Sequence, residues 1–169
     1  MNGVVLEKGS VSVKNVALAI AFLIISSKIT LPFYPVPLTL QMFAVYFLGL
    51  ALSPRESFLA GLGWLVLGSI GLPVFATGQI GLFRPTVGYL VGMLFGMPLI
   101  GYLVSKKVSY YFSCIISLIL IYAAGCLGLA AFGFDHLIQM GVAPFVVSDI
   151  LKIALANSLF ILIRKGFKK

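Results

Sequence analysis

Six long apolar runs, separated by short segments that hold most of the charged residues, constrain this chain more than any other feature. A run of about 17–25 apolar residues can cross the hydrocarbon core of a bilayer as a helix. Of the 169 residues, 61% are hydrophobic and only 9% are charged, too few polar side chains to cover a soluble domain. The sequence therefore predicts an all-α membrane protein, a single domain over residues 1–169 with a bundle of six transmembrane helices. The expected spans lie near 15–31, 38–53, 55–72, 86–105, 109–131 and 145–163.

Basic residues gather on one side of this six-span topology. With six spans both termini lie on the same side, and that side holds Lys8, Lys14, Arg55, Lys106, Lys107, Arg164, Lys165, Lys168 and Lys169. Lys and Arg concentrate on the cytoplasmic side of membrane proteins. We therefore expect a multi-pass protein of the cell (inner, cytoplasmic) membrane with both termini in the cytoplasm. The same rule accounts for the net charge of +8, so the charge does not require a nucleic-acid partner. We also expect the first span to remain as a transmembrane helix, because it is too long for a cleaved signal peptide.

The last apolar run carries the only oppositely charged pair inside a predicted span, Asp149 and Lys152. A charged side chain at the bilayer centre costs about 2.5–3.5 kcal/mol on insertion scales, so it faces a bundle interior, a water-filled cavity or a ligand. Residues three positions apart share one face of a helix. The pair can hold a small polar ligand, neutralise itself as a structural ion pair, or relay protons or ions.

The depth of Asp149 favours the first of these interpretations. Asp149 lies about one turn inside the outer end of its span, so the pair opens towards the outer loops. A ligand pocket of this kind has mostly apolar walls and a few polar groups that fix orientation. The expected apolar walls are Tyr34, Trp64, Phe75 and Tyr89.

Two outer loops, 30–37 and 71–86, are rich in proline, glycine and aromatic residues. Irregular backbone at membrane depth is tolerated where it is buried in protein or lines a cavity. We therefore expect these loops to form lids or pocket walls, with short surface turns as the alternative. Arg84 is the only cation in its loop, and we expect it at the outer mouth of the pocket.

Small residues recur at a spacing of four, which lets helices approach closely. Gly88, Gly92 and Gly96 form one such row, and we expect it to pack the bundle internally. Ala17 and Ala21 form another row in the first span. That second row fits internal packing and a partner helix equally well.

The sequence offers little on which an enzyme could be built. It has no P-loop motif, and its single histidine, His136, stands beside Asp135 in an outer loop and cannot form a usual metal site. Cys114 and Cys126 lie in one apolar run, about 18 Å apart on a straight helix, too far for a disulfide. We therefore expect no catalytic residues, no bound metal and no cofactor in this chain.

Three segments resemble the signatures of the BioY family. They are 35–41 (Pro-Val-Pro-Leu-Thr-Leu-Gln), 71–75 with 85–92 (Gly-Leu-Pro-Val-Phe, then Pro-Thr-x-Gly-Tyr-Leu-x-Gly), and 144–152 (Pro-Phe-x-x-x-Asp-x-x-Lys). They follow the family's order and span nearly the whole chain. The resemblance implies a six-helix, biotin-binding membrane subunit, the S component of an energy-coupling-factor (ECF) transporter. It also implies a transmembrane coupling subunit and a pair of cytoplasmic ATPases that bind the ATP, with biotin as the substrate.

The same resemblance assigns roles to particular residues. Asp149 and Lys152 match the family's carboxylate and lysine that contact polar groups of biotin, and Ala17 and Ala21 match the helix face that meets the coupling subunit. The expected substrate-binding set is Asp149, Lys152, Arg84, Tyr89, Phe75, Thr77, Gln79 and Tyr34.

This chain departs from the family pattern at two places. It has Arg84 before Pro85-Thr86 where the family usually has glycine, and Val147-Ser148 before Asp149 where the family usually has Pro-Gly. Arg84 either contacts the valerate carboxylate of biotin or extends its guanidinium into water. The alternatives to a biotin subunit are an S component for another vitamin-like ligand, and a non-transporting membrane scaffold whose Asp-Lys pair is purely structural.

Overall fold

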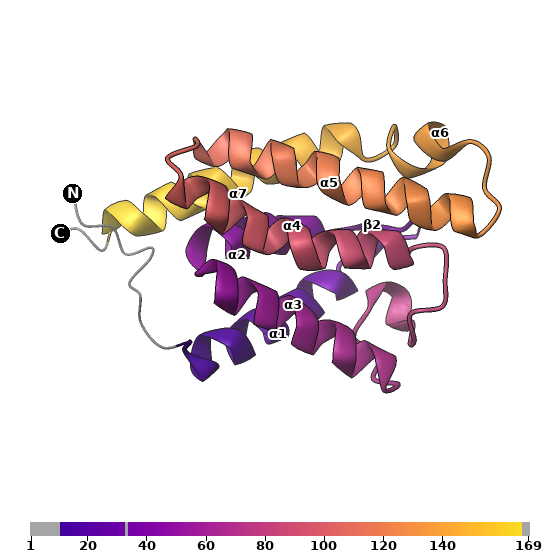
Figure 1. The fold of residues 1–169 in the computed structure, drawn as a ribbon, viewed down its shortest axis with the longest axis horizontal. Coiled ribbons are helices and arrows are strands. Elements are labelled where there is room, and N and C mark those ends of the chain that lie inside the picture. The colour runs from indigo at the N-terminus through magenta and orange to yellow at the C-terminus, as the bar shows by residue number, and fades with distance from the viewer. Residues whose placement is uncertain (1–10, 33, 167–169) are drawn as a thin grey trace.

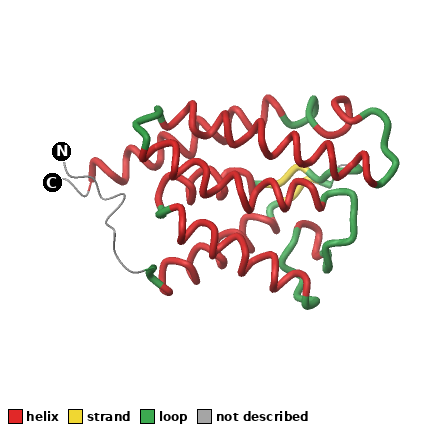
Figure 2. The backbone as a smooth tube through the Cα atoms, viewed as in Figure 1, coloured by secondary structure: helices red, strands yellow, loops and turns green. Residues whose placement is uncertain are grey.

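The computed structural model describes residues 11–32 and 34–166. Lys8, Lys168 and Lys169, which the charge argument placed in the cytoplasm, lie outside the described residues. Over the described part the secondary structure is almost wholly helical (Figures 1 and 2). Its α-helices are α1 Val13–Lys28, α2 Gln41–Ala51, α3 Pro54–Ser69, α4 Val87–Ser105, α5 Tyr110–Ala131, α6 Leu137–Gly141 and α7 Val146–Gly166.

Two small elements complete the fold. β1 (Thr30–Leu31) and β2 (Leu38–Thr39) pair antiparallel, with Thr30 opposite Thr39. The turn between them is the proline-rich loop. The 3₁₀ turn η1 (Ala76–Gly78) lies in the long segment between α3 and α4.

The helix α2 lies at the centre of the bundle. It packs against α1, α4 and α7, and most of its side chains are buried. The pair α4 and α5 forms the most extensive helix contact, α3 covers α4 on another side, and α1 rests on α2 and α3. This arrangement explains why α2 has apolar residues all around it, because a helix enclosed by neighbours has no polar face.

Glycines set the close approach of α4 and α5. A Cβ atom at Gly88 would lie 2.0 Å from the Ala124 carbonyl oxygen, one at Gly92 would lie 2.9 Å from Ile121 Cα, and one at Gly96 would lie 2.6 Å from Ser117 Oγ. Only residues without a Cβ fit at these distances. The prediction that this glycine row packs the bundle internally is confirmed.

Serine side chains cap the N-termini of three helices. Ser53 Oγ accepts from Glu56 N, and Glu56 Oε2 in turn accepts from Ser53 N at 3.1 Å, which is a capping box with Pro54 in the first turn. Such reciprocal bonds satisfy backbone N–H groups that a helix start leaves open. Ser12 and Ser109 cap α1 and α5.

Glu56 also ties α1 to the α2–α3 turn. Its Oε1 accepts hydrogen bonds from Ser12 N at 3.2 Å and from Asn15 Nδ2 at 3.0 Å. The start of α1 is therefore fastened at the end of the bundle where α7 finishes and where the α4–α5 turn lies (Figure 1).

Six of the helices coincide with the six predicted spans, with corrections at their ends. The first predicted span continued to residue 31, but α1 ends at Lys28 and the chain enters β1. The second began at 38, where the structure has β2 instead. Proline at 32, 35 and 37 cannot supply backbone donors to a helix, so the hairpin replaces both helix ends. The short helix α6 was not predicted.

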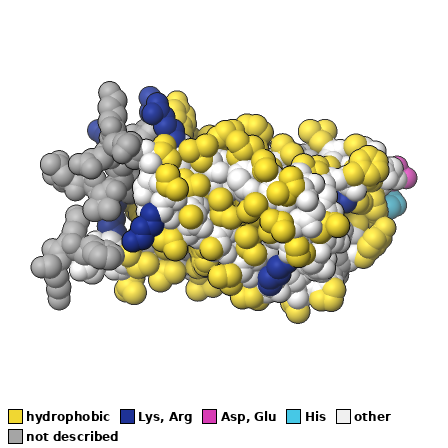
Figure 3. Space-filling view, turned by 90° about the horizontal axis from the view of Figure 1, so that it is seen from below, with side chains coloured by type: hydrophobic (Ala, Val, Ile, Leu, Met, Phe, Trp, Pro, Cys, Tyr) yellow, Lys and Arg dark blue, Asp and Glu magenta, His cyan; other side chains and the backbone are white. Residues whose placement is uncertain are grey.

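On the face drawn in Figure 3, hydrophobic side chains cover much of the surface along the helices. Large hydrophobic side chains point outwards from most of the bundle, among them Leu18 in α1, Leu127 in α5 and Leu162 in α7, exposed by 61%, 73% and 70%. A soluble protein rarely exposes a continuous apolar belt. By length and composition α4, α5 and α7 can each cross a membrane. The chain is therefore an all-helical membrane protein.

Candidate functional site

A pocket lies at the end of the bundle opposite the α2–α3 and α4–α5 turns. Its volume is about 60 Å³. Its walls come from the β1–β2 hairpin, α2, the segment between α3 and α4, α4, α5 and α7. The lining residues are Val36, Pro37, Thr39, Gln41, Met42, Ala76, Gln79, Arg84, Thr86, Tyr89, Leu90, Met93, Tyr122, Phe145, Asp149 and Lys152.

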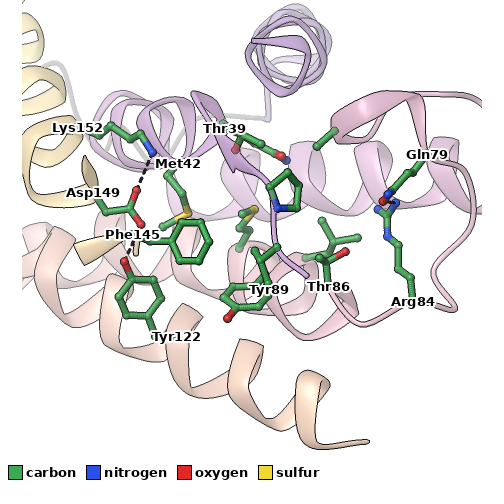
Figure 4. Close-up of a pocket in the computed structure, with 16 residues that line it drawn as sticks. Thr39, Met42, Gln79, Arg84, Thr86, Tyr89, Tyr122, Phe145, Asp149 and Lys152 are labelled. Atoms are coloured by element: carbon green, nitrogen blue, oxygen red, sulfur yellow. Dashed lines mark hydrogen bonds and ion pairs between the residues drawn. The ribbon is translucent and has the colours of Figure 1, made fainter. Parts of the chain in front are cut away.

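One end of the pocket is a charged cluster on the first two turns of α7 (Figure 4). Lys152 Nζ donates to Asp149 Oδ1 at 2.8 Å and to Ser148 Oγ at 3.2 Å. Tyr122 Oη, from α5, donates to Asp149 Oδ2 at 2.8 Å. Asp149 is only 2% exposed and Lys152 only 8%. The predicted pairing on one helix face is confirmed, and both carboxylate oxygens have a donor.

The other end of the pocket holds Arg84 and Gln79 (Figure 4). Arg84 Nη1 donates to Gln79 Oε1 at 2.6 Å, and the guanidinium carbon lies 4.3 Å from the centre of the Phe75 ring. Burial lowers the pKa of Arg84 to about 10, so the guanidinium is cationic at neutral pH. Among the residues that the structure describes, none accepts a hydrogen bond from the buried Arg84 Nε.

Apolar side chains line the space between these two ends. Met42 and Phe145 lie on the side of the charged cluster, and Tyr89 and Thr86 continue towards Arg84 (Figure 4). Tyr89 is anchored because its hydroxyl donates to the Gly141 carbonyl at 2.7 Å. The pocket is thus mostly apolar along its length, with a few polar side chains such as Thr39, and it is charged at both ends. This is the composition of a small-molecule site.

Donors from two helices hold the loop that carries Phe75 and Arg84. Ser27 Oγ donates to the Val74 carbonyl at 2.9 Å, and Trp64 Nε1 donates to the same oxygen at 3.2 Å. Lys28 Nζ donates to the Pro73 carbonyl and, at 3.0 Å, to that of Phe75. The prediction that the 30–37 and 71–86 loops form pocket walls is confirmed, since both contribute lining residues.

A second, more open chamber adjoins the pocket on its outer side. Its volume is about 390 Å³. The two chambers share Pro37, Gln79, Arg84 and Thr86, and the outer one is completed by Pro32, Tyr34, Pro35, Thr77 and Pro85.

The structure distributes the eight predicted substrate-binding residues over three places. The inner pocket contains Asp149, Lys152, Tyr89, Gln79 and Arg84, whereas Tyr34 and Thr77 line only the outer chamber. Phe75 lines neither chamber. It is fully buried behind the pocket wall. Its ring packs edge-on against Trp64, with the ring centres 5.0 Å apart, and the Arg84 guanidinium lies over its face. Phe75 and Trp64 were expected to line the pocket, but they lie behind the residues that line it.

Sequence reasoning missed several pocket residues. Tyr122 and Gln41 are the most informative, because each is a polar residue within an apolar run and so carried the same signal that revealed Asp149. Thr39 and Phe145 lie in the segments 35–41 and 144–152 that resemble family signatures, and that resemblance was the signal that could have found them. Met42 and Met93 carried no distinguishing signal, since their spacing is that of ordinary core residues.

Other chemistry in the described residues is sparse. No group of three or more His, Cys, Asp or Glu side chains there could hold a metal ion. Cys114 and Cys126 are both free, as their separation along one helix predicted. Ala17 and Ala21 are exposed on α1, so they do not pack this bundle internally.

Fold and site together define a class: an all-helical membrane protein with a pocket for a small molecule at one end of the bundle. Comparisons with known proteins identify the family. The sequence model of the BioY family matches residues 7–169, and this chain belongs to that family. The family is one of transporter S components and not of enzymes.

Individual relatives agree with this assignment. A probable biotin transporter BioY from Pyrococcus horikoshii is 40% identical over 148 residues, which cover 85% of this chain and 90% of the relative. The biotin transporter BioY from Thermotoga maritima is 36% identical over 153 residues, covering 86% and 90%. A crystal structure of the S-component for biotin from an ECF-type ABC transporter superimposes with a TM-score of 0.76 at 26% identity, covering 92% of this chain and 90% of that one.

Proposed function

We propose that this chain is the biotin-binding membrane subunit of an ECF-type transporter. It captures biotin at the outer face and delivers it together with a transmembrane coupling subunit and two cytoplasmic ATPases. The observation that carries the proposal is the pocket with two polar ends, Asp149 with Lys152 at one and Arg84 at the other, separated by apolar walls.

Biotin has the matching distribution of chemical groups. Its ureido ring offers N–H donors and a carbonyl acceptor, its thioether ring and methylene chain are apolar, and its chain ends in a carboxylate. Asp149 accepts hydrogen bonds and Lys152 donates them, so this pair suits the ureido ring. Arg84 suits the carboxylate, because a guanidinium can donate two parallel hydrogen bonds to it. The partnerless Arg84 Nε, among the described residues, supports an anion at this place.

The size of the inner chamber adds a condition. Ligand pockets usually measure about 300–1,000 Å³, whereas the inner chamber holds about 60 Å³ and the outer one about 390 Å³. Biotin therefore fits only if side chains on the wall that the two chambers share move aside. In this arrangement Tyr34 and Thr77 cover the outer part of the ligand, while Tyr89 and Phe75 shape or support its wall.

Topology and partners follow from the same proposal. The helices α1 to α5 and α7 form the six membrane-embedded segments in the membrane of the cell, and both termini lie in the cytoplasm together with the capped turns of Ser53 and Ser109. The exposed small residues Ala17 and Ala21 form the face on which the coupling subunit packs, since small side chains let helices approach closely. ATP is bound by the partner subunits, and this chain needs no cofactor of its own.

Saturable binding of biotin by the purified chain in detergent tests the proposal, with competition by other vitamins as the second arm. Binding of biotin in preference to the competitors is expected. Preference for another vitamin would identify a different S component, and no saturable binding of any of them would favour a structural scaffold. ATP-driven uptake should require co-expression of the coupling subunit and the ATPases.

A further inference from the structure

Gln41 is a buried amide with unused hydrogen-bonding capacity in the pocket wall. It is the first residue of α2, it is 2% exposed, and it lines the inner pocket. Its Nε2 has no hydrogen-bond partner among the described residues. Buried polar side-chain atoms nearly always have a partner, so an orphaned amide at a pocket wall needs an explanation.

Two observations place the start of α2 near the charged end of the pocket. The three residues that precede Gln41, Leu38 to Leu40, line a surface groove together with Lys152. The helix α2 that begins with Gln41 packs against α7, whose first turn carries Asp149. Gln41 therefore lines the pocket from a different helix than the ion pair.

The neighbouring polar groups are already engaged with one another. Asp149 Oδ1 accepts from Lys152 and Asp149 Oδ2 accepts from Tyr122. An ionised carboxylate only accepts hydrogen bonds and an ammonium only donates them, whereas a glutamine amide does both. The Gln41 amide can therefore offer a donor and an acceptor side by side in one plane.

We propose that Gln41 recognises the ureido edge of the ligand with two hydrogen bonds. Its Nε2 donates to the ureido oxygen and its Oε1 accepts from a ureido N–H, which closes a cyclic pair. This inference rests on the proposed function and extends it, because it makes Gln41 the residue that selects a neutral cyclic urea. A site built to hydrogen-bond a group strongly rejects an analogue that presents the wrong partner.

2-Iminobiotin is an analogue that presents the wrong hydrogen-bonding partner to an amide. It replaces the ureido oxygen with nitrogen and is a guanidinium cation at neutral pH, so its edge only donates. Facing Gln41, this edge places an N–H against the Nε2 donor. Facing a carboxylate in the same position, it can donate two parallel hydrogen bonds. The substitution Gln41→Glu keeps the size of the side chain and removes its donor.

The test measures Kd for biotin and for 2-iminobiotin by calorimetry on the full chain in detergent. The unmodified chain should prefer biotin. In Gln41→Glu the affinity for biotin should fall by more than about tenfold, the loss expected when a buried hydrogen bond is broken, while the affinity for 2-iminobiotin stays the same or rises. Gln41→Met, which removes both groups without adding charge, should weaken biotin more than 2-iminobiotin and carries the test if the glutamate variant does not fold.

A charge control comes from Gln139→Glu, which makes the same change at an exposed position of α6 that lines neither chamber. It should leave the preference for biotin over 2-iminobiotin in place. Equal changes for both ligands in the Gln41 variants, or a shift of preference by Gln139→Glu as large as that by Gln41→Glu, would overturn the assignment and leave Gln41 as a water-bound structural amide. Failure of the unmodified chain to bind biotin at all would instead remove the proposed function, and this inference with it.

Discussion

Tyr122 Oη donates a hydrogen bond of 2.8 Å to Asp149 Oδ2, and this single contact joins the middle of α5 to the first turn of α7. The opposite carboxylate oxygen receives Lys152 from the same helix. The carboxylate is therefore fixed in orientation by two donors on different elements. A site whose polar groups are held in place before the ligand arrives loses less freedom on binding.

The first prediction concerns this contact. Tyr122→Phe removes the donor but keeps the ring, so Asp149 keeps its contact with Lys152 and loses its tie to α5. We expect biotin affinity to fall by about tenfold or less, as for one lost hydrogen bond to a charged group. Calorimetry on the purified variant checks this. Tyr111→Phe, the same change at a side chain 44% exposed on the same helix, should bind as the unmodified chain does; an equal loss there would assign the effect to the helix and not to Asp149.

The second prediction concerns the ion pair itself. Asp149→Asn and Lys152→Ala should each weaken biotin binding by more than about tenfold, because each leaves the other buried group without its partner. Both variants should still insert into the membrane and elute from a sizing column as a single species. The measurement is the Kd of each variant. Near-normal binding in both would reduce the pair to a structural role.

The third prediction concerns the α4–α5 contact. Gly88→Ala places a Cβ atom where only 2.0 Å separates it from the Ala124 carbonyl oxygen, so the helices must separate. Overpacking of this kind costs about 1–3 kcal/mol, and the thermal midpoint in detergent should fall. Gly166→Ala is the matched control, because nothing lies within 4 Å of its Cβ. An unchanged midpoint for Gly88→Ala would contradict the observed packing.

The sequence predicted the positions of the helices well, because hydrophobicity decides them. It predicted the helix ends and the loop structure less well. The apolar runs located α1 to α5 and α7, and the buried charge located the α7 end of the pocket, because both signals are local. The end of α1 at Lys28 and the hairpin of Thr30 with Thr39 depend on proline positions and on long-range pairing. Those are weaker signals than a run of apolar side chains.

The pocket walls show the same division. Arg84 and Gln79 could be assigned to the site as polar residues of an apolar loop, but the direction of Phe75 could not. Whether that ring faces the ligand or the core depends on Trp64 and on three donors from α1 and α3 that hold the loop backbone. The contacts of Ser27 and Lys28 with this loop join residues more than forty positions apart. No pattern within a single segment predicts such contacts.

The fourth prediction separates ligand binding from coupling. Ala17 and Ala21 are exposed on α1 and line neither chamber, so Ala17→Leu or Ala21→Leu should leave biotin affinity unchanged. ATP-driven uptake should be abolished, because a bulky side chain prevents close approach of a partner helix. Uptake in cells that express the coupling subunit and ATPases measures this. Ala123→Leu, on an exposed position of α5, is the matched control; if it abolishes uptake equally, or if the α1 variants transport normally, the partner face lies elsewhere.

The fifth prediction concerns Arg84 and the carboxylate of the ligand. Arg84 is held by Gln79 and stacked on Phe75, and its guanidinium can bind a carboxylate with a geometry that a lysine cannot reproduce. Arg84→Gly should therefore lower affinity for biotin more than for a biotin amide, which lacks the charge. Arg84→Lys keeps the charge, so it should retain part of the preference for biotin over the amide that Arg84→Gly loses. Calorimetry with both ligands on each variant measures these losses. Equal losses for biotin and its amide, or no loss for either, would make Arg84 a support for the loop rather than a contact to the ligand.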